Sequence, residues 1–459
     1  MSPIPSTEEL DLLDRLLDRL PPGETGDARL VAHRFGTMRF ANGRVHQPHA
    51  ETERVVSLRV ARGSRLAVAT TTDLTPGGLA ALIRSARSLA GIAPVERHFP
   101  GFSAPSGNRP KPVAFSRETA RMSLDRQGRM AGAMLEAARS DWPDARVSGA
   151  LHVGEELLAV ANSAGVHAST RRSVAQGSLL VDRPDQDPPV SGWSEGAHWD
   201  VERLDPRRLG AEAAARVARR PPETVKPGRY RVLLDGPAFA ELALWLAFLG
   251  FGGHGEAEKW SPLRRRRGKR IAPPSLTIVD DGASAETLPQ GIDFEGRTKR
   301  RTPLVERGVA QAAVTDLLTS ARLGGRSTGH ALPPESPWGD FGPVPTQVIV
   351  APGDASRDAL IRETRRGLLV TRFHYVRVVD PGRAVITGMT RDGTYRIEGG
   401  EVVAPVRNLR FTESVLTAMA RLEHLGRERR VYADERGRQA ITCPAAVTGA
   451  FTFTSATLF

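Results

Sequence analysis

The first residues that could do chemistry are a histidine and two glutamates in a short glycine-rich stretch. The stretch reads GGHGEAEKW and places His254 two positions before Glu256. Imidazole and carboxylate groups both bind zinc, and a hydrolytic zinc site needs about three protein ligands and an open position for water. A histidine and a glutamate alone form a weak pattern, and loops of this composition are usually solvated. We therefore expect a surface loop, with a metal site as the alternative.

Two more residues could complete a substitute metal site. Cys443 is the only cysteine of the chain, and His374 lies in the stretch VTRFHY. A lone cysteine cannot form an intramolecular disulfide and is most simply a small buried apolar residue. The alternative ligand set is therefore His254, Glu256, His374 and Cys443.

The charge balance raises the question of a nucleic-acid partner. The formal net charge is +12, and the run RRRRGKR spans Arg264 to Arg270. Only five of the 64 basic residues are lysine, and the abundant arginine, alanine, glycine and proline fit a GC-rich coding bias. The few aromatic residues do not interleave with the arginines as a stacking platform requires. We expect no nucleic-acid partner and a solvated run, and the alternative is a binding protein whose affinity falls steeply with salt.

Helices and strands mix along the chain without regular alternation. VVSLRV and RLAVAT flank a glycine-containing turn and predict a hairpin, and TPGGLAALIRSARSLAG predicts a helix with a start and a stop. The proline-rich segment RRPPETVKPG marks a domain boundary near residue 222. The pattern favours an α+β fold with an N-terminal domain over 1–222 and a second domain over 223–459.

The second domain begins with a strand and a long apolar segment. PAFAELALWLAFLG predicts a helix with Pro237 in its first turn, and VAQAAVTDLLTSARLG predicts another helix. Asp280 and Asp281 follow a short strand and are most simply turn residues. The final GAFTFTSATLF alternates as an edge or terminal strand does.

Nothing in the sequence predicts a membrane segment or a secretory signal. The longest apolar run, Leu242 to Phe251, is far shorter than the roughly 20 residues that span a bilayer. The N-terminus MSPIPSTEELDLLDRLL carries acids and lacks a continuous apolar core. We expect a soluble cytoplasmic protein with no membrane partner.

Several stretches in order over nearly the whole chain resemble the TldD/PmbA family of metallopeptidase-related proteins, also called TldD/TldE. They include LRVARGSRLAVATTTDLT, LLAVANSAGVHAST, SLTIVDDG with GIDFEGRTKRRTPLVERGV, RSTGHA, VIVAPGDASRDALIRETRRGLLVTRF and YRIEGGEVVAPVRNLRF. The resemblance implies an N-terminal α+β domain, a larger sheet-rich C-terminal domain and two related subunits that pair. In that family the TldD-type subunit carries HExxxH on a helix with a distal cysteine as third zinc ligand, and the TldE-type partner lacks them.

This sequence departs from the TldD-type pattern at each ligand position. Counted from Pro237, the motif falls on Trp245 and Leu246 in the apolar stretch LALWLAFLG, and Tyr432 or Ala433 stands where the cysteine is expected. The resemblance therefore implies a TldE-like subunit with no catalytic residue, no metal and no cofactor. Its expected partners are a TldD-like HExxxH subunit, which holds the zinc, and a peptide substrate, with a homodimer as the form in isolation.

The resemblance also indicates which residues approach the peptide cleft. They are His330 in RSTGHA and Thr371, Arg372 and His374 in VTRFHY. Lone histidines are more often structural, so a purely structural role is the competing interpretation. An autonomous metallopeptidase that uses the substitute ligands stays as the enzymatic alternative, and a nucleic-acid or gyrase-associated binding protein stays as the non-enzymatic one.

Overall fold

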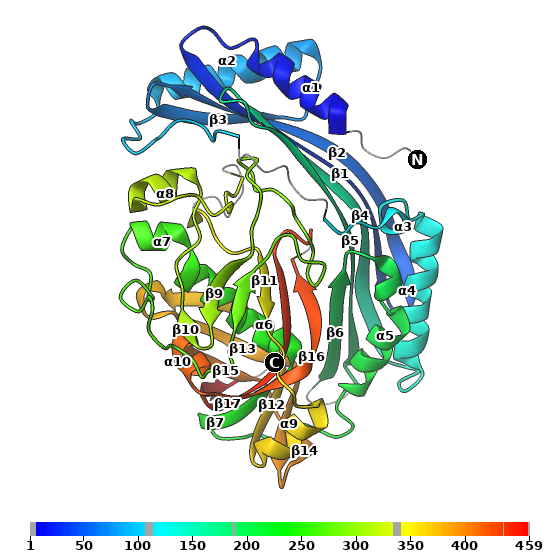
Figure 1. The fold of residues 1–459 in the computed structure, drawn as a ribbon. Coiled ribbons are helices and arrows are strands. Elements are labelled where there is room, and N and C mark those ends of the chain that lie inside the picture. Colours follow the sequence, from blue (N-terminus) through cyan, green and yellow to red (C-terminus); the bar gives the residue numbers. More distant parts are fainter. Residues whose placement is uncertain (1–5, 106–112, 186–188, 334–340, 435, 458–459) are drawn as a thin grey trace.

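The computed structural model describes residues 6–105, 113–185, 189–333, 341–434 and 436–457. Figure 1 shows a long curved sheet formed by the first part of the chain, and a second group of strands that lies against its inner side. Helices and a large, mostly antiparallel set of strands are both present, which confirms the α+β fold class.

The curved sheet is antiparallel and uses strands from the first half of the sequence. In spatial order it contains β3 (Arg65–Thr71), β2 (Arg44–Arg62), β1 (Glu24–Ala41), β4 (Arg146–Asn162), β5 (His167–Arg183) and β6 (Val190–His198). The predicted hairpin is confirmed, because β2 and β3 pair from Val56–Thr71 to Arg62–Arg65. Both strands are longer than the apolar stretches that predicted them.

Helices cover the outer side and the upper end of this sheet (Figure 1). They are α1 (Ser6–Leu17), α2 (Pro76–Ile92), α3 (Arg117–Ala120), α4 (Leu124–Arg139), the 3₁₀ turn Val201–Arg203 and α5 (Pro206–Ala215). The predicted helix α2 is confirmed: the Thr75 hydroxyl accepts from the N–H of Gly78, and Pro76 occupies the first turn. Its buried face, which includes Leu82, Ile83 and Ala86, packs on the sheet.

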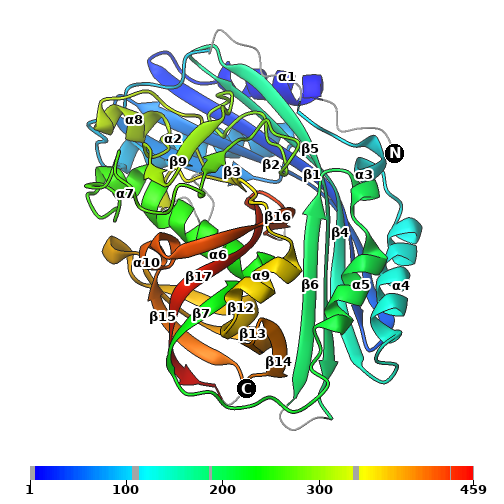
Figure 2. The same cartoon turned by 60° about the horizontal axis from the view of Figure 1, so that its bottom comes forward.

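The second group of strands closes into a barrel. β7 (Gly228–Leu234) pairs in parallel with β12 (Gly367–Asp380), which continues through β13 (Val385–Glu398), β15 (Leu409–Ser414) and β17 (Ala440–Ala456) back to β7. Phe373, Phe411, Phe451 and Phe453 pack together in its core. Figure 2 shows the barrel strands and the curved sheet side by side from below.

Other elements extend the barrel towards the curved sheet. The strands are β8 (Ile278–Asp280), β9 (Thr302–Glu306), β10 (Val309–Ala310), β11 (Gln347–Val350), β14 (Glu401–Pro405) and β16 (Leu422–Ala433). The helices are α6 (Gly236–Trp245) with a π-helical turn (Leu246–Gly250), α7 (Gly253–Ala257), α8 (Leu317–Leu323), α9 (Arg357–Thr364), the 3₁₀ turn Pro381–Arg383 and α10 (Val415–Ala420). A single residue pair, Ala197 with Val431, connects β6 to β16.

Two predictions of local structure are wrong, and a third holds in part. The stretch around His254 is the short helix α7, because Gly253 packs closely on the backbone of Val314 and the chain turns there. The predicted helix 309–324 is helical only in α8, since Val309 and Ala310 pair with β9 and the N–H of Val314 bonds to Phe251. The final segment, predicted as an edge or terminal strand, belongs to β17, the last strand in chain order, but it is not an edge strand, because β17 pairs with β7, β15, β16 and β11.

No helix among the described residues is long and apolar enough to cross a bilayer.

Candidate functional site

The helix expected to carry metal ligands in a catalytic relative is apolar here. α6 begins after Asp235, with Pro237 in its first turn, and runs directly into the π-helical turn Leu246–Gly250, whose residues are all buried. Leu246 is part of the barrel-side core, and Trp245 packs against that core. The Trp245 indole donates to the Glu241 carboxylate at 2.9 Å. Apart from that carboxylate, the side chains of α6 and of the π-helical turn are aliphatic or aromatic.

An aromatic side chain fills the space beside the start of α6. Tyr432 on β16 lies so close that a Cβ on Gly236 would sit 1.9 Å from the tyrosine hydroxyl oxygen. Burial raises the pKa of Tyr432 well above its ordinary value. Tyr432 therefore packs on the helix as a neutral group, at the position where the resemblance leads one to look for a cysteine.

The four substitute ligands lie on different elements. His254 and Glu256 are in α7, and Glu256 accepts from the Arg267 guanidinium at 2.7 Å. His374 is on β12, and Cys443 is buried on β17, where burial raises the pKa of its thiol. Within the described parts of the chain, no three histidine, cysteine, aspartate or glutamate side chains gather closely enough to hold a metal ion.

The arginine run separates into one inward residue and several outward ones. Arg267 donates to the carbonyls of Gly250 and Gln311 at 2.8 and 2.9 Å, and its guanidinium lies 5.0 Å from the centre of the Phe251 ring. Arg264, Arg265, Arg266, Lys269 and Arg270 are exposed. Arg267 therefore anchors the π-helical turn and α7, while its neighbours face solvent as expected.

A cavity of about 600 Å³, called the central cavity here, lies beside the π-helical turn. Its apolar wall consists of Phe248, Phe294, Ala331, Leu332, Pro333 and Val344. Its polar wall consists of Gln290, Asp293, Lys299, His330, Thr346, Asp434, Arg436, Arg438 and Gln439. A cavity of this volume with both apolar and polar walls is typical of ligand sites.

A buried network around Asp280 forms the base of the polar wall. One Asp280 oxygen lies 3.0 Å from His330 Nε2 and 3.5 Å from Lys299 Nζ, and the other accepts the N–H groups of Thr346 and Gln347 at 2.6 and 2.8 Å. Burial opposes the charge, but these partners keep the pKa of Asp280 below its ordinary value. The prediction that Asp280 is a turn residue is wrong, because its carboxylate is fully buried. Asp281 does form the turn, accepting the N–H of Ala283 at 3.1 Å.

Among the predicted cleft residues, His330 alone lines the central cavity. Its Nδ1 lies 2.9 Å from the Thr328 hydroxyl, so both ring nitrogens have partners. Asp293 fixes the same loop, accepting the N–H of Ala331 at 3.0 Å and those of Glu295 and Arg297. The imidazole is therefore held in one orientation at the cavity wall.

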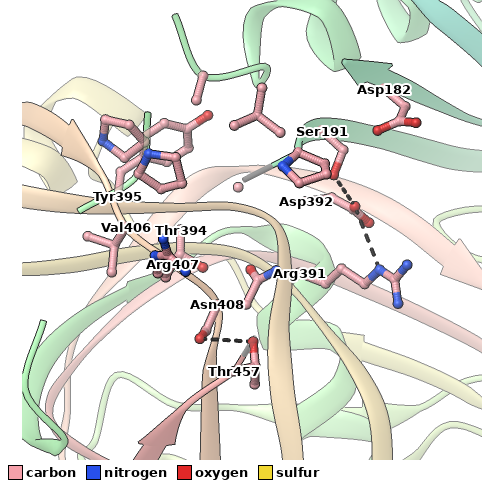
Figure 3. Close-up of a pocket in the computed structure, with 16 residues that line it drawn as sticks. Asp182, Ser191, Arg391, Asp392, Thr394, Tyr395, Val406, Arg407, Asn408 and Thr457 are labelled. Atoms are coloured by element: carbon pink, nitrogen blue, oxygen red, sulfur yellow. Dashed lines mark hydrogen bonds and ion pairs between the residues drawn. The ribbon is translucent and has the colours of Figure 1, made fainter. Parts of the chain in front are cut away.

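Thr371 and Arg372 do not line the central cavity, but both contact residues of a different cavity of about 450 Å³, beside the segment that joins the two halves of the chain (Figure 3). Asp392 lines it, accepts a hydrogen bond from the Ser191 hydroxyl at 2.6 Å and forms an ion pair with Arg372 at 2.6 Å. The Arg372 guanidinium lies 4.1 Å from the Trp193 ring centre. Thr371 is buried beneath and donates to the carbonyls of this bulged segment.

The fourth cleft candidate, His374, is two residues further along β12 and lines neither cavity. Burial and the nearby Arg391 and Arg372 lower its pKa. Of the four predicted cleft residues, only His330 lines one of these two cavities, so the structure does not bring the set together.

The sequence interpretation missed a buried ionic network that holds residues 436–439 at the central cavity. Arg172 on β5 donates to the carbonyls of Arg436 and Gly437 at 2.9 and 2.5 Å and to Glu156 at 3.1 Å. Arg438 donates to the same glutamate at 2.7 Å. Burial opposes ionisation of Glu156, yet the two arginines lower its pKa to about 2. Charged residues inside the apolar strands VGEELLAVA and TRRSVAQ were the signal available for this network.

Two family models match this chain. The model described as PmbA/TldA metallopeptidase C-terminal domain matches residues 227–455, and that of PmbA/TldA metallopeptidase domain 1 matches residues 26–90. Together they cover well over half of the sequence. The chain belongs to the PmbA/TldD family of metallopeptidase-related proteins.

Individual relatives agree with this family. A metalloprotease of Methanothermobacter thermautotrophicus is 28% identical over 250 residues, which are 53% of this chain and 52% of the relative. A metalloprotease TldD homolog of Buchnera aphidicola is 26% identical over 163 residues, 35% of this chain and 32% of the relative. The match thus spans about half of the first relative and less of the second.

The fold itself matches along the whole chain. The crystal structure of TldE from Thermococcus kodakarensis superposes with a TM-score of 0.85 at 18% identity, over 98% of this chain and 100% of that one. At such low identity the likeness shows a shared fold.

Proposed function

We propose that this chain is a TldE-like subunit without catalytic residues of its own, which pairs with a TldD-like zinc metallopeptidase acting on unfolded or modified peptides. One observation carries the proposal. α6 and its π-helical turn are apolar where the family's zinc motif is expected, and no histidine of the sequence is followed directly by glutamate, so HExxxH does not occur. Zinc, which a hydrolytic site of this kind requires, would then come from the partner.

The central cavity supports a peptide-holding role. It lies beside the π-helical turn that follows α6 and offers apolar surface together with fixed polar groups. An extended peptide can bind in such a groove through its backbone, which makes binding tolerant of side chains. A folded protein would not fit a space of about 600 Å³. On this proposal the pair works in the cytoplasm.

The test compares the chain alone with the chain mixed with a family member that carries HExxxH. Zinc per chain is measured by mass spectrometry, assembly by light scattering, and cleavage with reduced, unfolded casein. We expect substoichiometric zinc and no cleavage for the chain alone, as a monomer or homodimer, and cleavage only for the mixed complex. Replacing the glutamate of the partner's HExxxH should abolish cleavage without disrupting the complex.

The variant His254→Ala separates this proposal from an autonomous metallopeptidase. We expect unchanged assembly and unchanged cleavage by the complex, because Glu256, the neighbouring substitute ligand, is already paired with Arg267. Stoichiometric zinc and turnover by the isolated chain, both lost in His254→Ala, would replace the proposal with the autonomous enzyme.

A further inference from the structure

The central cavity continues into a second, more polar cavity on the inner face of the curved sheet. This second cavity has a volume of about 350 Å³ and is lined by Thr37, Arg39, Gln47, His49, Glu51, Ala150, His152, Gln176, Ser178 and Arg436. Arg436 lines both cavities, so its side chain stands where they meet. We call this second cavity the polar cavity.

Strand register explains why the polar cavity is so rich in hydrogen-bonding groups. His49, Thr37, His152 and Gln176 face one another across β2, β1, β4 and β5, because the pairs His49–Thr37, Thr37–His152 and His152–Gln176 are in register. Directly opposed side chains in a sheet lie about 5 Å apart. The row therefore presents donors and acceptors at regular intervals along the floor of the cavity.

Charge is unevenly compensated across the two cavities. Lys299 is balanced by Asp280 at 3.5 Å and Arg438 by Glu156 at 2.7 Å. Among the carboxylates that the structure describes, Arg436 reaches only Glu51, at 4.0 Å. In the described residues, no carboxylate lies within ion-pair distance of Arg39.

Among the described residues that line the polar cavity, Glu51 is the carboxylate, and it is shared. His33 Nε2 lies 3.4 Å from one of its oxygens and His49 Nε2 lies 3.8 Å from the other. Asp293 and Asp434, the carboxylates of the central cavity, accept backbone N–H groups and do not lie within ion-pair distance of Arg436 or Arg39.

The backbone of Arg436 is fixed while its side chain remains available. Arg172 holds the carbonyls of Arg436 and Gly437, and Asp434 accepts the N–H groups of Arg438 and Gln439 at 2.8 and 3.3 Å. The Arg436 side chain is 45% exposed. A guanidinium on a rigid turn loses little freedom when it binds, and its planar donors match a carboxylate.

We infer that Arg436, assisted by Arg39, binds a carboxylate of the peptide held in these cavities, so that acidic peptides are the preferred class. The inference rests on the proposed peptide-holding function and adds a specificity to it. The apolar wall of the central cavity would take the flanking aliphatic side chains, and the row of polar groups on the sheet would bond to the peptide backbone.

The experiment measures binding of two blocked peptides by calorimetry, to the isolated chain and to its complex with an HExxxH partner inactivated at its glutamate. The peptides are acetyl-Ala-Leu-Ala-Glu-Ala-Leu-Ala-amide and its glutamine counterpart, so the only carboxylate is the glutamate. We expect the glutamate peptide to bind about five- to tenfold tighter at low salt, as one charge-assisted pair provides. Arg436→Gln should bring the two affinities within about twofold of each other. Arg436→Glu should bind a third peptide, with lysine in place of the glutamate, more tightly than it binds the glutamate peptide.

Arg410→Gln, which removes an exposed arginine on β15 outside both cavities, is the matched control and should keep the preference. Thermal unfolding followed by circular dichroism checks that each variant is folded. Equal binding of both peptides to the wild type, or a preference that survives in Arg436→Gln, overturns the role of Arg436 and leaves the proposed function intact. Binding of neither peptide, in isolation or in the complex, overturns both.

Discussion

His152 shows how one side chain in the polar cavity couples burial to pH. Its ring stacks on Phe35 at 4.2 Å, and Nδ1 lies 2.9 Å from the Thr37 hydroxyl. Burial lowers the pKa of His152 from 6.5 to about 4, although Glu51 acts in the opposite direction. The folded protein therefore keeps this ring neutral in a range where the unfolded chain protonates it.

The pH dependence follows from the sign of that shift. Between pH 6.5 and about 4 the unfolded chain binds more protons at this site, so stability falls as pH falls through the window. The loss of stability at His152 is absent above pH 6.5 and reaches roughly 3 kcal/mol below about pH 4. Urea denaturation at pH 7 and pH 4.5 should show a smaller loss for His152→Gln than for the wild type.

The exposed His98 provides the control for this measurement. His98→Gln should lose as much stability between the two pH values as the wild type does. An equal loss in His152→Gln would show that the buried imidazole does not govern this part of the pH profile.

At the level of elements, the bulge in β13 depends on one hydroxyl. Thr371 Oγ1 lies 2.8, 3.0 and 3.3 Å from the carbonyls of Gly393, Asp392 and Arg391. Asp392 and Gly393 both have positive φ, at 55° and 129°, and the pairing of β12 with β13 shifts register here. The hydroxyl thus stabilises a backbone conformation that few residues adopt.

Replacing Thr371 by valine keeps its shape and removes the donor. We expect Thr371→Val to lower the free energy of unfolding by about 1–3 kcal/mol, because buried carbonyls lose a partner. Thr371→Ser keeps the hydroxyl and should be closer to the wild type. If chemical denaturation shows that the Thr371→Val variant is as stable as the wild type, Thr371 has no such structural role. That result would favour the prediction that Thr371 belongs to a peptide cleft.

Sequence patterns correctly predicted elements that depend on neighbouring residues. They failed for elements whose structure depends on contacts with distant segments of the chain. The β2–β3 hairpin and α2 follow from alternation, turn residues and caps within about 40 residues. β17 alternates like an edge strand, but β7 and β15 approach it from far along the chain, and alternation does not report neighbours. The Ala-rich segment before α8 has helical spacing, yet pairing with β9 fixes part of it as strand.

The same distinction between local and distant contacts applies to the candidate site. The absence of HExxxH and of a cysteine near position 432 is visible in the sequence, and the structure adds that apolar and aromatic groups occupy the space. The roles of Asp280, Arg172 and Arg436 depend on contacts between segments that are distant in the sequence, which no local pattern reports.

At the level of the whole molecule, two arginines connect the curved sheet to the barrel side. Arg172 on β5 holds the turn after β16, and Arg430 on β16 forms a two-pronged pair with Glu212 on α5, both bonds 2.7 Å long. Strand pairing between these two parts is limited to Ala197–Val431 in the described residues. Two buried apolar clusters, which include Phe35 with Val431 and Leu158 with Phe294, also join the two parts, so the ionic contacts act together with apolar packing.

The stabilisation that Glu156 and Glu212 provide through their arginine partners is lost only in strong acid. Burial opposes ionisation of Glu156 and Glu212, but their arginine partners lower both pKa values from 4.5 to about 2. Both carboxylates bind fewer protons when folded, so their contribution is fully present above pH 4.5 and is lost as pH falls through about 2. Scanning calorimetry at pH 7 should therefore show one transition for the wild type.

The double variant Arg172→Met with Arg430→Met tests this directly. It leaves buried glutamates with fewer partners, which costs about 3–5 kcal/mol for a fully buried pair such as Glu156 with Arg172. We expect the calorimetric transition to separate into two, one for the curved sheet and one for the barrel. Arg207→Met, which breaks the exposed pair with Glu136, should keep a single transition. A double variant that unfolds in one transition at lower temperature would mean that apolar packing, not these two arginines, makes the halves unfold together.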